Sequence, residues 1–185
     1  MQLNKLSVMA IALGVLSSTS VMAVSSGTIT FGGEVLAATC EVTLNSSSSA
    51  TGDITLPPAA VSNLDVAAKT AGKISFTLAL KNCATSDYKG TPIIPFAYFS
   101  NGSTSATLPN TASSKDAAGN VDIELLDYNG IAIKINDIIS QRTQAASTPF
   151  TSGSHNLLYF AQYKATGPAT AGKVASTVNY NIEYK

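Results

Sequence analysis

Apolar and polar residues alternate with a period of two through much of this chain. Between residues 72 and 83, the apolar side chains of Ile74, Phe76, Leu78 and Leu80 are separated by polar or small ones. The last fourteen residues, 172–185, repeat the pattern. Their apolar members are Val174, Val178, Tyr180, Ile182 and Tyr184. Because successive side chains of a strand point to opposite faces, each segment predicts a β-strand with one buried face.

Several more segments have the character of short strands, and loops rich in Gly, Pro, Ser and Asn separate them. They are 24–31, 34–44, 54–56, 92–99, 121–126, 131–135 and 156–165. Asn129-Gly130 lies between two of them and predicts a hairpin. The helix candidates, 61–68 and 137–144, are short. We therefore expect an all-β, Greek-key, immunoglobulin-like sandwich.

The N-terminal residues have the pattern of a secretion signal. Lys5 supplies a positive charge, 6–16 is an apolar run, and Val21-Met22-Ala23 fits a cleavage site. We expect cleavage after Ala23, which leaves 24–185 for one domain with a substantial core. The apolar run is too short to cross a bilayer, and no other run reaches that length, so we expect no direct membrane insertion.

Composition narrows the choice of partners. Without Lys5, ten basic residues face eleven acidic ones, and Arg142 is the single arginine. This balance argues against binding to nucleic acid or to an anionic membrane. Cys40 and Cys83 are the only cysteines, and export favours a disulfide between them. A loop of 43 residues would contribute on the order of 4 kcal/mol. A metal site or a catalytic thiol is the alternative.

Residues typical of catalysis do not gather in the sequence. His155 is the only histidine, and no nucleophile-elbow motif is present. Asp122 and Glu124 stand two apart on a predicted strand, which places both on one face that we expect to be solvated. Phosphate loops, dinucleotide fingerprints and zinc spacings are missing as well. We expect a protein that is not an enzyme, with no cofactor and no metal.

Three motifs together carry a resemblance to a known family. One is 27–35 leading to Cys40, and another is 76–83. The most specific has Gly172 fourteenth from the end and Tyr184 penultimate. With these motifs the chain resembles a pilin subunit of the chaperone–usher family, of the type 1-like major subunit kind. Glu41, directly after the first cysteine, departs from the family pattern.

The resemblance implies an immunoglobulin-like sandwich that lacks its last strand. A chain that ends inside a core strand also leaves no sequence for a next strand beside it. By resemblance, a periplasmic chaperone lends the missing strand. At the outer-membrane usher, the N-terminal extension of a neighbouring copy or of another fimbrial subunit then replaces it, by donor-strand exchange. The protein is then expected to be exported through the periplasm to the cell surface, as part of an adhesive fimbrium.

Residue roles follow from the same resemblance. The expected division is 1–23 signal peptide, 24–32 donor extension and 33–185 pilin domain. Gly27, Ile29 and Phe31 are expected to enter the groove of another subunit. The expected groove and chaperone-binding residues are Gly172, Val174, Val178, Tyr180, Ile182 and Tyr184, together with Lys185, whose carboxylate would meet basic chaperone residues.

Some alternatives stay open at this stage. Ile29 and Phe31 could form the first strand of the domain's own sheet, Gly172 could be a turn glycine, and Tyr184 could be an ordinary core aromatic. A repeating subunit of the pilus shaft is the leading interpretation. A minor adaptor or tip-associated subunit of the same fimbrium is the second, and a periplasmic sandwich protein with a small-molecule site is the third.

Overall fold

The computed structural model divides the chain into two compact units, Met1–Glu34 and Val35–Lys185. It describes residues 28–33, 35, 40–45, 47–87, 89–113, 115–147, 149 and 152–185. The predicted signal peptide and Gly27 therefore lie outside the described residues. Both sheets and the core belong to the second unit.

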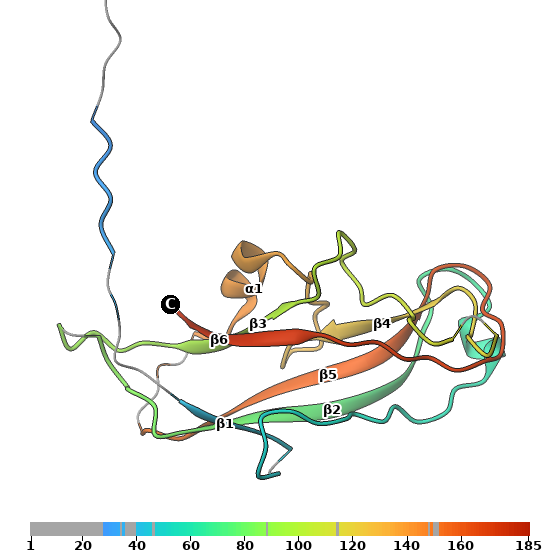
Figure 1. The fold of residues 1–185 in the computed structure, drawn as a ribbon, viewed down its shortest axis with the longest axis horizontal. Coiled ribbons are helices and arrows are strands. Elements are labelled where there is room, and N and C mark those ends of the chain that lie inside the picture. The colour runs from blue at the N-terminus through green and yellow to red at the C-terminus, as the bar shows by residue number, and fades with distance from the viewer. Residues whose placement is uncertain are drawn as a thin grey trace, which may run out of the picture. The chain divides into compact units, whose positions relative to one another are not determined.

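Two antiparallel sheets face each other across the core of this unit (Figure 1). The first sheet has the strand order β1-β2-β5-β4 and the second pairs β3 with β6. The first contains β1 (Glu41–Leu44), β2 (Thr70–Lys81), β5 (His155–Ala165) and β4 (Val121–Leu126). The second contains β3 (Pro95–Ser100) and β6 (Asn179–Tyr184). The predicted all-β sandwich is confirmed.

Alternation along the central strands builds the core. On β2, the side chains of Phe76, Leu78 and Leu80 are buried, whereas the residues between them are more exposed. Phe76 pairs with Tyr159 of β5, and both rings meet Phe99 of β3, with ring centroids 6.2 and 4.9 Å away. Aromatic contacts at these separations stabilise a core beyond the area they bury. This aromatic group joins the two sheets.

Both predicted helices are present, although each is shorter than expected. A 3-10 helix, η1, spans Val61–Leu64, and α1 spans Ile138–Gln144. The side chain of Asp137 accepts a hydrogen bond from the backbone N–H of Ser140 at 2.9 Å, so it acts as the N-cap of α1. Among the described residues, no helix is long and apolar enough to cross a membrane.

The prediction of one strand over 172–185 was too long. The strand β6 begins only at Asn179, and the residues before it bind a loop instead. Lys173 accepts from the N–H of Ala118 at 2.9 Å, and Ala175 accepts from the N–H of Thr111 at 2.7 Å. Because the loop takes these backbone groups, 172–178 forms no ladder, and Gly172 and Val174 do not belong to a terminal strand. The alternation of exposure nevertheless continues from Val174 to Tyr184.

Two further predicted strands are not strands in the structure. Residues 54–56 are irregular, and 131–135 forms only an isolated bridge to β4, between Ala132 and Leu126. The side chain of Asp127 accepts from the N–H groups of Asn129 and Ile131 at 2.9 and 2.8 Å. This local turn uses the backbone donor that a regular hairpin would place in the ladder.

Candidate functional site

The two edges of the β3–β6 sheet differ. On the β3 edge, the amide side chain of Gln141 binds both backbone groups of Phe99, accepting from its N–H at 2.8 Å and donating to its C=O at 3.0 Å. The hydroxyl of Tyr159 accepts from the N–H of Ala97 at 3.1 Å. Two side chains therefore occupy the positions that a neighbouring strand would take. No local pattern around Gln141, which is 4% exposed, indicates this role.

The outer edge of β6, which we call the open edge, has no such cover at Tyr180 and Ile182, whereas the guanidinium of Arg142 donates to the C=O of Tyr184 at 3.3 Å. In an antiparallel pair, residues whose backbone groups face the partner alternate with residues whose groups face away. Phe99 and Ala97 face away from β6, so their partners Tyr180 and Ile182 present N–H and C=O at the open edge. Within the described part of the chain, no strand pairs with this edge.

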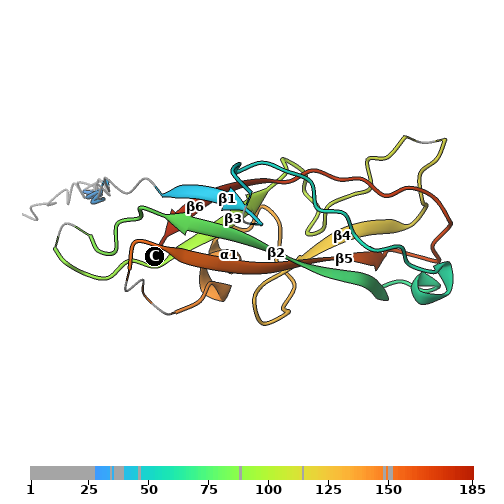
Figure 2. The same ribbon diagram turned by 90° about the horizontal axis from the view of Figure 1, so that it is seen from below.

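Half-buried apolar side chains line both sides of the open edge. Val178, Tyr180 and Ile182 pack against the core from the β6 side without being fully covered. Four residues do the same from the side of the first sheet, and they are Val42, Leu44, Ile54 and Leu56. Figure 2 shows β1 and β6 along the same side of the sandwich. An unpaired strand edge beside uncovered apolar side chains is a template for strand addition.

A disulfide fixes one end of this region. Cys40 and Cys83 are bonded, with their Cα atoms 4.4 Å apart. The bond connects the residue before β1 to the segment that follows β2 and closes a loop with a sequence separation of 43 residues. The hydroxyl of Tyr184, on β6, lies 3.3 Å from the sulfur of Cys40. The end of β6 therefore contacts the disulfide of the other sheet.

Gly172 lies where two backbone segments approach each other closely. A Cβ atom at this position would overlap the backbone nitrogen of Ala118 and the carbonyl group of Ala117, whose oxygen would lie 2.6 Å away. Lys173 forms a parallel bridge with Ala117 beside it. The expectation of a groove residue and its alternative of a turn glycine both missed this constraint. Gly172 is required because a side chain does not fit.

Gly172 and Val174 also line a cavity of about 250 Å³. It lies against η1 and the segment before β6, and a second small core cluster surrounds it. Its other lining residues include Pro58, Leu64 and Tyr163. The apolar surface beside β6 therefore continues from the start of this strand into the segment that precedes it.

The residues predicted to donate a strand are in the first unit. Ile29 is 78% exposed and Phe31 is 89% exposed, and neither is part of a strand. The alternative in which they form the first strand of the domain's own sheet finds no pairing in the described residues. Two large apolar side chains at alternate positions remain available to a partner.

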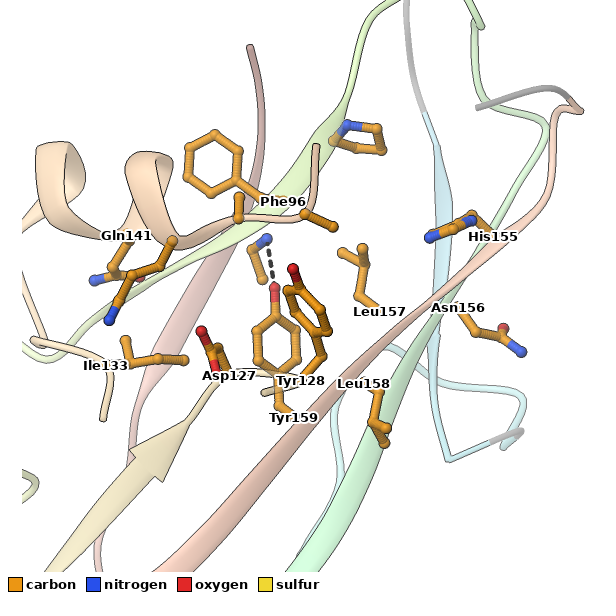
Figure 3. Close-up of a pocket in the computed structure, with 15 residues that line it drawn as sticks. Phe96, Asp127, Tyr128, Ile133, Gln141, His155, Asn156, Leu157, Leu158 and Tyr159 are labelled. Atoms are coloured by element: carbon orange, nitrogen blue, oxygen red, sulfur yellow. Dashed lines mark hydrogen bonds between the residues drawn. The ribbon is translucent and has the colours of Figure 1, made fainter. Parts of the chain in front are cut away.

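A second cavity, of about 290 Å³, lies between β3, β5 and α1 (Figure 3). Tyr159 and Asp127 line it, together with His155 at its rim. Burial, together with the charge of Asp127, raises the pKa of Tyr159 to about 12, despite the opposing hydrogen bond from Ala97. Burial lowers the pKa of His155. Asp127 holds the turn after β4 and Tyr159 holds the β3 edge, which gives both side chains a structural role.

The acidic pair predicted on a solvated face is not equally solvated. Glu124 is only 6% exposed and binds the ammonium group of Lys164 and the amide of Gln162. Asp122 accepts from the hydroxyl of Thr107 at 2.6 Å. Neighbouring β5 side chains cover Glu124, which the period of two along β4 alone could not reveal. In the described residues, no group of three or more His, Cys, Asp or Glu could hold a metal ion.

The chain is similar to known proteins over most of its length. Residues 29–185 match the family described as fimbrial protein. The F17 fimbrial protein of Escherichia coli is 37% identical over 179 residues, which cover 94% of this chain and 96% of the relative. The minor fimbrial subunit HifD of Haemophilus influenzae is 31% identical, over 85% of this chain and 74% of the relative. A major fimbrial subunit of the same organism is 32% identical, over 87% and 88%.

A solved structure supports the fold. The P pilus rod subunit PapA covers 79% of this chain and 99% of its own, with a TM-score of 0.55 and 17% sequence identity. At that identity the likeness concerns the fold alone, and it is an immunoglobulin-like pilin fold. The predicted class of sandwich is confirmed.

Proposed function

The chain belongs to the fimbrial protein family, and we propose that it joins its neighbours by donor-strand exchange at the open edge of β6. Members of this family are structural subunits that build extracellular pili. The observation that carries the proposal is the contrast between the two edges of one sheet. Side chains cover the edge of β3, whereas β6 presents the backbone groups of Tyr180 and Ile182 beside half-buried apolar side chains.

We propose residues 24–32 of another copy as the incoming strand. Ile29 and Phe31 are large, exposed and two positions apart, so in a strand they point to the same face. Burying each would contribute roughly 1.5–3 kcal/mol, and ladder hydrogen bonds would add to this. The sum is comparable with the stability of a small domain, roughly 5–15 kcal/mol. A subunit without a donor is therefore marginal.

Two accessory partners belong to the proposal. A periplasmic chaperone would cover the open edge before assembly, and an outer-membrane usher would be the place where a neighbour's extension replaces it. The support is the same unpaired edge, since a long apolar strand edge left uncovered in the periplasm leads to aggregation. The signal-like residues 1–23 fit this route through the periplasm.

Deletion of 24–32 from the mature chain tests the exchange. The truncated subunit should still accept a strand, because its open edge is intact, but it should donate none. Mixed with the full-length subunit during assembly, it should terminate fibres and shorten them in proportion to its share. Fibre lengths in electron micrographs provide the measurement. Fibres of normal length that contain the truncated subunit at internal positions would contradict the proposed donor.

We propose a shaft position for this subunit. A chain with both a donor segment and an acceptor edge continues the fibre in both directions, and a relative named as a major subunit aligns with 87% of this chain. It should then be the most abundant protein in sheared fibres, as measured by quantitative mass spectrometry. One or a few copies per fibre would instead support a minor adaptor, the function that the similarity to HifD favours.

A further inference from the structure

Two tyrosine hydroxyls connect β6 to the first sheet across the open edge. Tyr180 donates to the backbone carbonyl of Ala50 at 2.8 Å, and the Tyr184 hydroxyl lies 3.3 Å from the Cys40 sulfur. Cys40 directly precedes β1, and Ala50 lies in the loop that follows it. The two contacts therefore reach both ends of β1 from residues that belong to the other sheet.

These contacts join β6 to the two ends of β1, on the side of the sandwich where an added strand would pair with the open edge (Figure 2). A strand paired with the open edge would run about 4.8 Å from β6 and send alternate side chains toward the core. On the first sheet, that core is bounded by the half-buried side chains of Val42 and Leu44. Tyr180 and Tyr184 reach over the same interval to Ala50 and Cys40. An incoming strand and the two hydroxyl contacts therefore compete for one place.

We propose that Tyr180 and Tyr184 form a latch that holds the open edge against the first sheet and must be released before a strand is added. The inference rests on the proposed donor-strand exchange and names two residues that control it. Burial raises the pKa of both tyrosines, and the charge of Glu183 raises that of Tyr184 further, so both hydroxyls keep their protons at neutral pH. Tyr180 therefore remains a hydrogen-bond donor under physiological conditions.

The expected gain in donor-strand affinity follows from the hydrogen bond that each substitution removes. The net contribution of one neutral hydrogen bond corresponds to a factor of about 2 to 12 in an equilibrium constant. Removing the Tyr180 hydroxyl should increase the affinity for a donor strand by about this factor. The Tyr184 hydroxyl has a sulfur neighbour, which is a weak acceptor, so its removal should have a smaller effect.

The experiment uses the full mature chain and a fluorescent peptide with the sequence of residues 24–32. Association is followed by fluorescence anisotropy for the wild type, Tyr180→Phe, Tyr184→Phe and the double variant. Tyr98→Phe is the matched control, because it removes the same atom from the same sheet, on β3, away from the open edge. We expect faster and tighter binding in the order double variant, Tyr180→Phe, Tyr184→Phe, and no change for Tyr98→Phe.

Thermal unfolding provides a second readout. It separates a latch from a contact that only stabilises the fold, because such a contact would stabilise the subunit equally with and without peptide. If the latch and the donor exclude each other, Tyr180→Phe should lower Tm without peptide and have no effect once peptide is bound. A loss of Tm that is equal in both states would overturn the latch, as would equal association rates in all variants. Failure of the peptide to bind any variant would instead overturn the proposed strand exchange, and the latch with it.

Discussion

Replacing Phe31 by Asp should abolish fibre formation without unfolding the subunit. Phe31 is 89% exposed, so the domain loses no core contact. In a fibre, the substitution would lose the burial of the phenyl ring, roughly 1.5–3 kcal/mol, and would place an unpaired carboxylate in an apolar site at a cost of several kcal/mol more. A total of about 5 kcal/mol corresponds to more than a thousandfold weaker strand addition.

Fibre yield by electron microscopy and the urea unfolding midpoint of the subunit together measure this effect. Thr30→Asp is the matched control, since it places the same charge one residue away, on the other face of an extended segment. We expect fibres from Thr30→Asp and none from Phe31→Asp, with similar midpoints. Fibres of normal length from Phe31→Asp would exclude Phe31 as a donor residue. Equal loss in both variants would mean that the segment does not bind as a two-faced strand.

Replacing Gly172 by Ala should produce the largest loss of stability of any conservative change in the domain. The new Cβ would overlap backbone atoms of Ala117 and Ala118, which cannot move aside as a side chain can. Relieving the overlap would separate the two segments. It would also break the hydrogen bonds of Lys173 to Ala118 and Asp116. We expect a loss of roughly 5 kcal/mol, at the upper end of single substitutions.

Equilibrium unfolding in urea, followed by circular dichroism, measures this loss. Gly32→Ala is the control, because a Cβ at Gly32 would have no atom within 4 Å. The control should retain the wild-type midpoint. A wild-type midpoint for Gly172→Ala as well would show that the two segments separate at little cost, and the close approach would not explain the glycine.

The regular elements could be predicted because their signal is local. Phe76, Leu78 and Leu80 stand two positions apart in the sequence, and on β2 the side chains alternate between core and surface with the same period of two. The helix candidate 137–144 likewise begins at Asp137, which is the N-cap of α1, and an N-cap needs only the backbone N–H three residues on. Errors arose where distant residues compete for backbone groups, as in 172–178, where the loop before β4 replaces a strand partner.

Some features of the candidate site likewise follow from the local sequence, and others do not. The half-buried positions of Tyr180 and Ile182 on β6, and of Val178 just before it, follow from the period of two. The covered edge of β3 does not, because Gln141 reaches Phe99 from 42 residues away. The hydroxyl contact between Tyr180 and Ala50 spans 130 residues, and no pattern along the chain encodes it. Glu124 was predicted to be solvated, and this was wrong because Lys164 and Gln162 of the neighbouring strand β5 bind its carboxylate.

The sequence by itself determined the class of fold, the single pair of cysteines and the two-faced character of the terminal strand. Each depends on residue type and on spacing within a few positions. Only the tertiary structure decided which sheet edge is covered and which is open, and why Gly172 has no side chain. Those properties depend on contacts between residues that are far apart in the sequence, and local periodicity does not determine which distant residues meet.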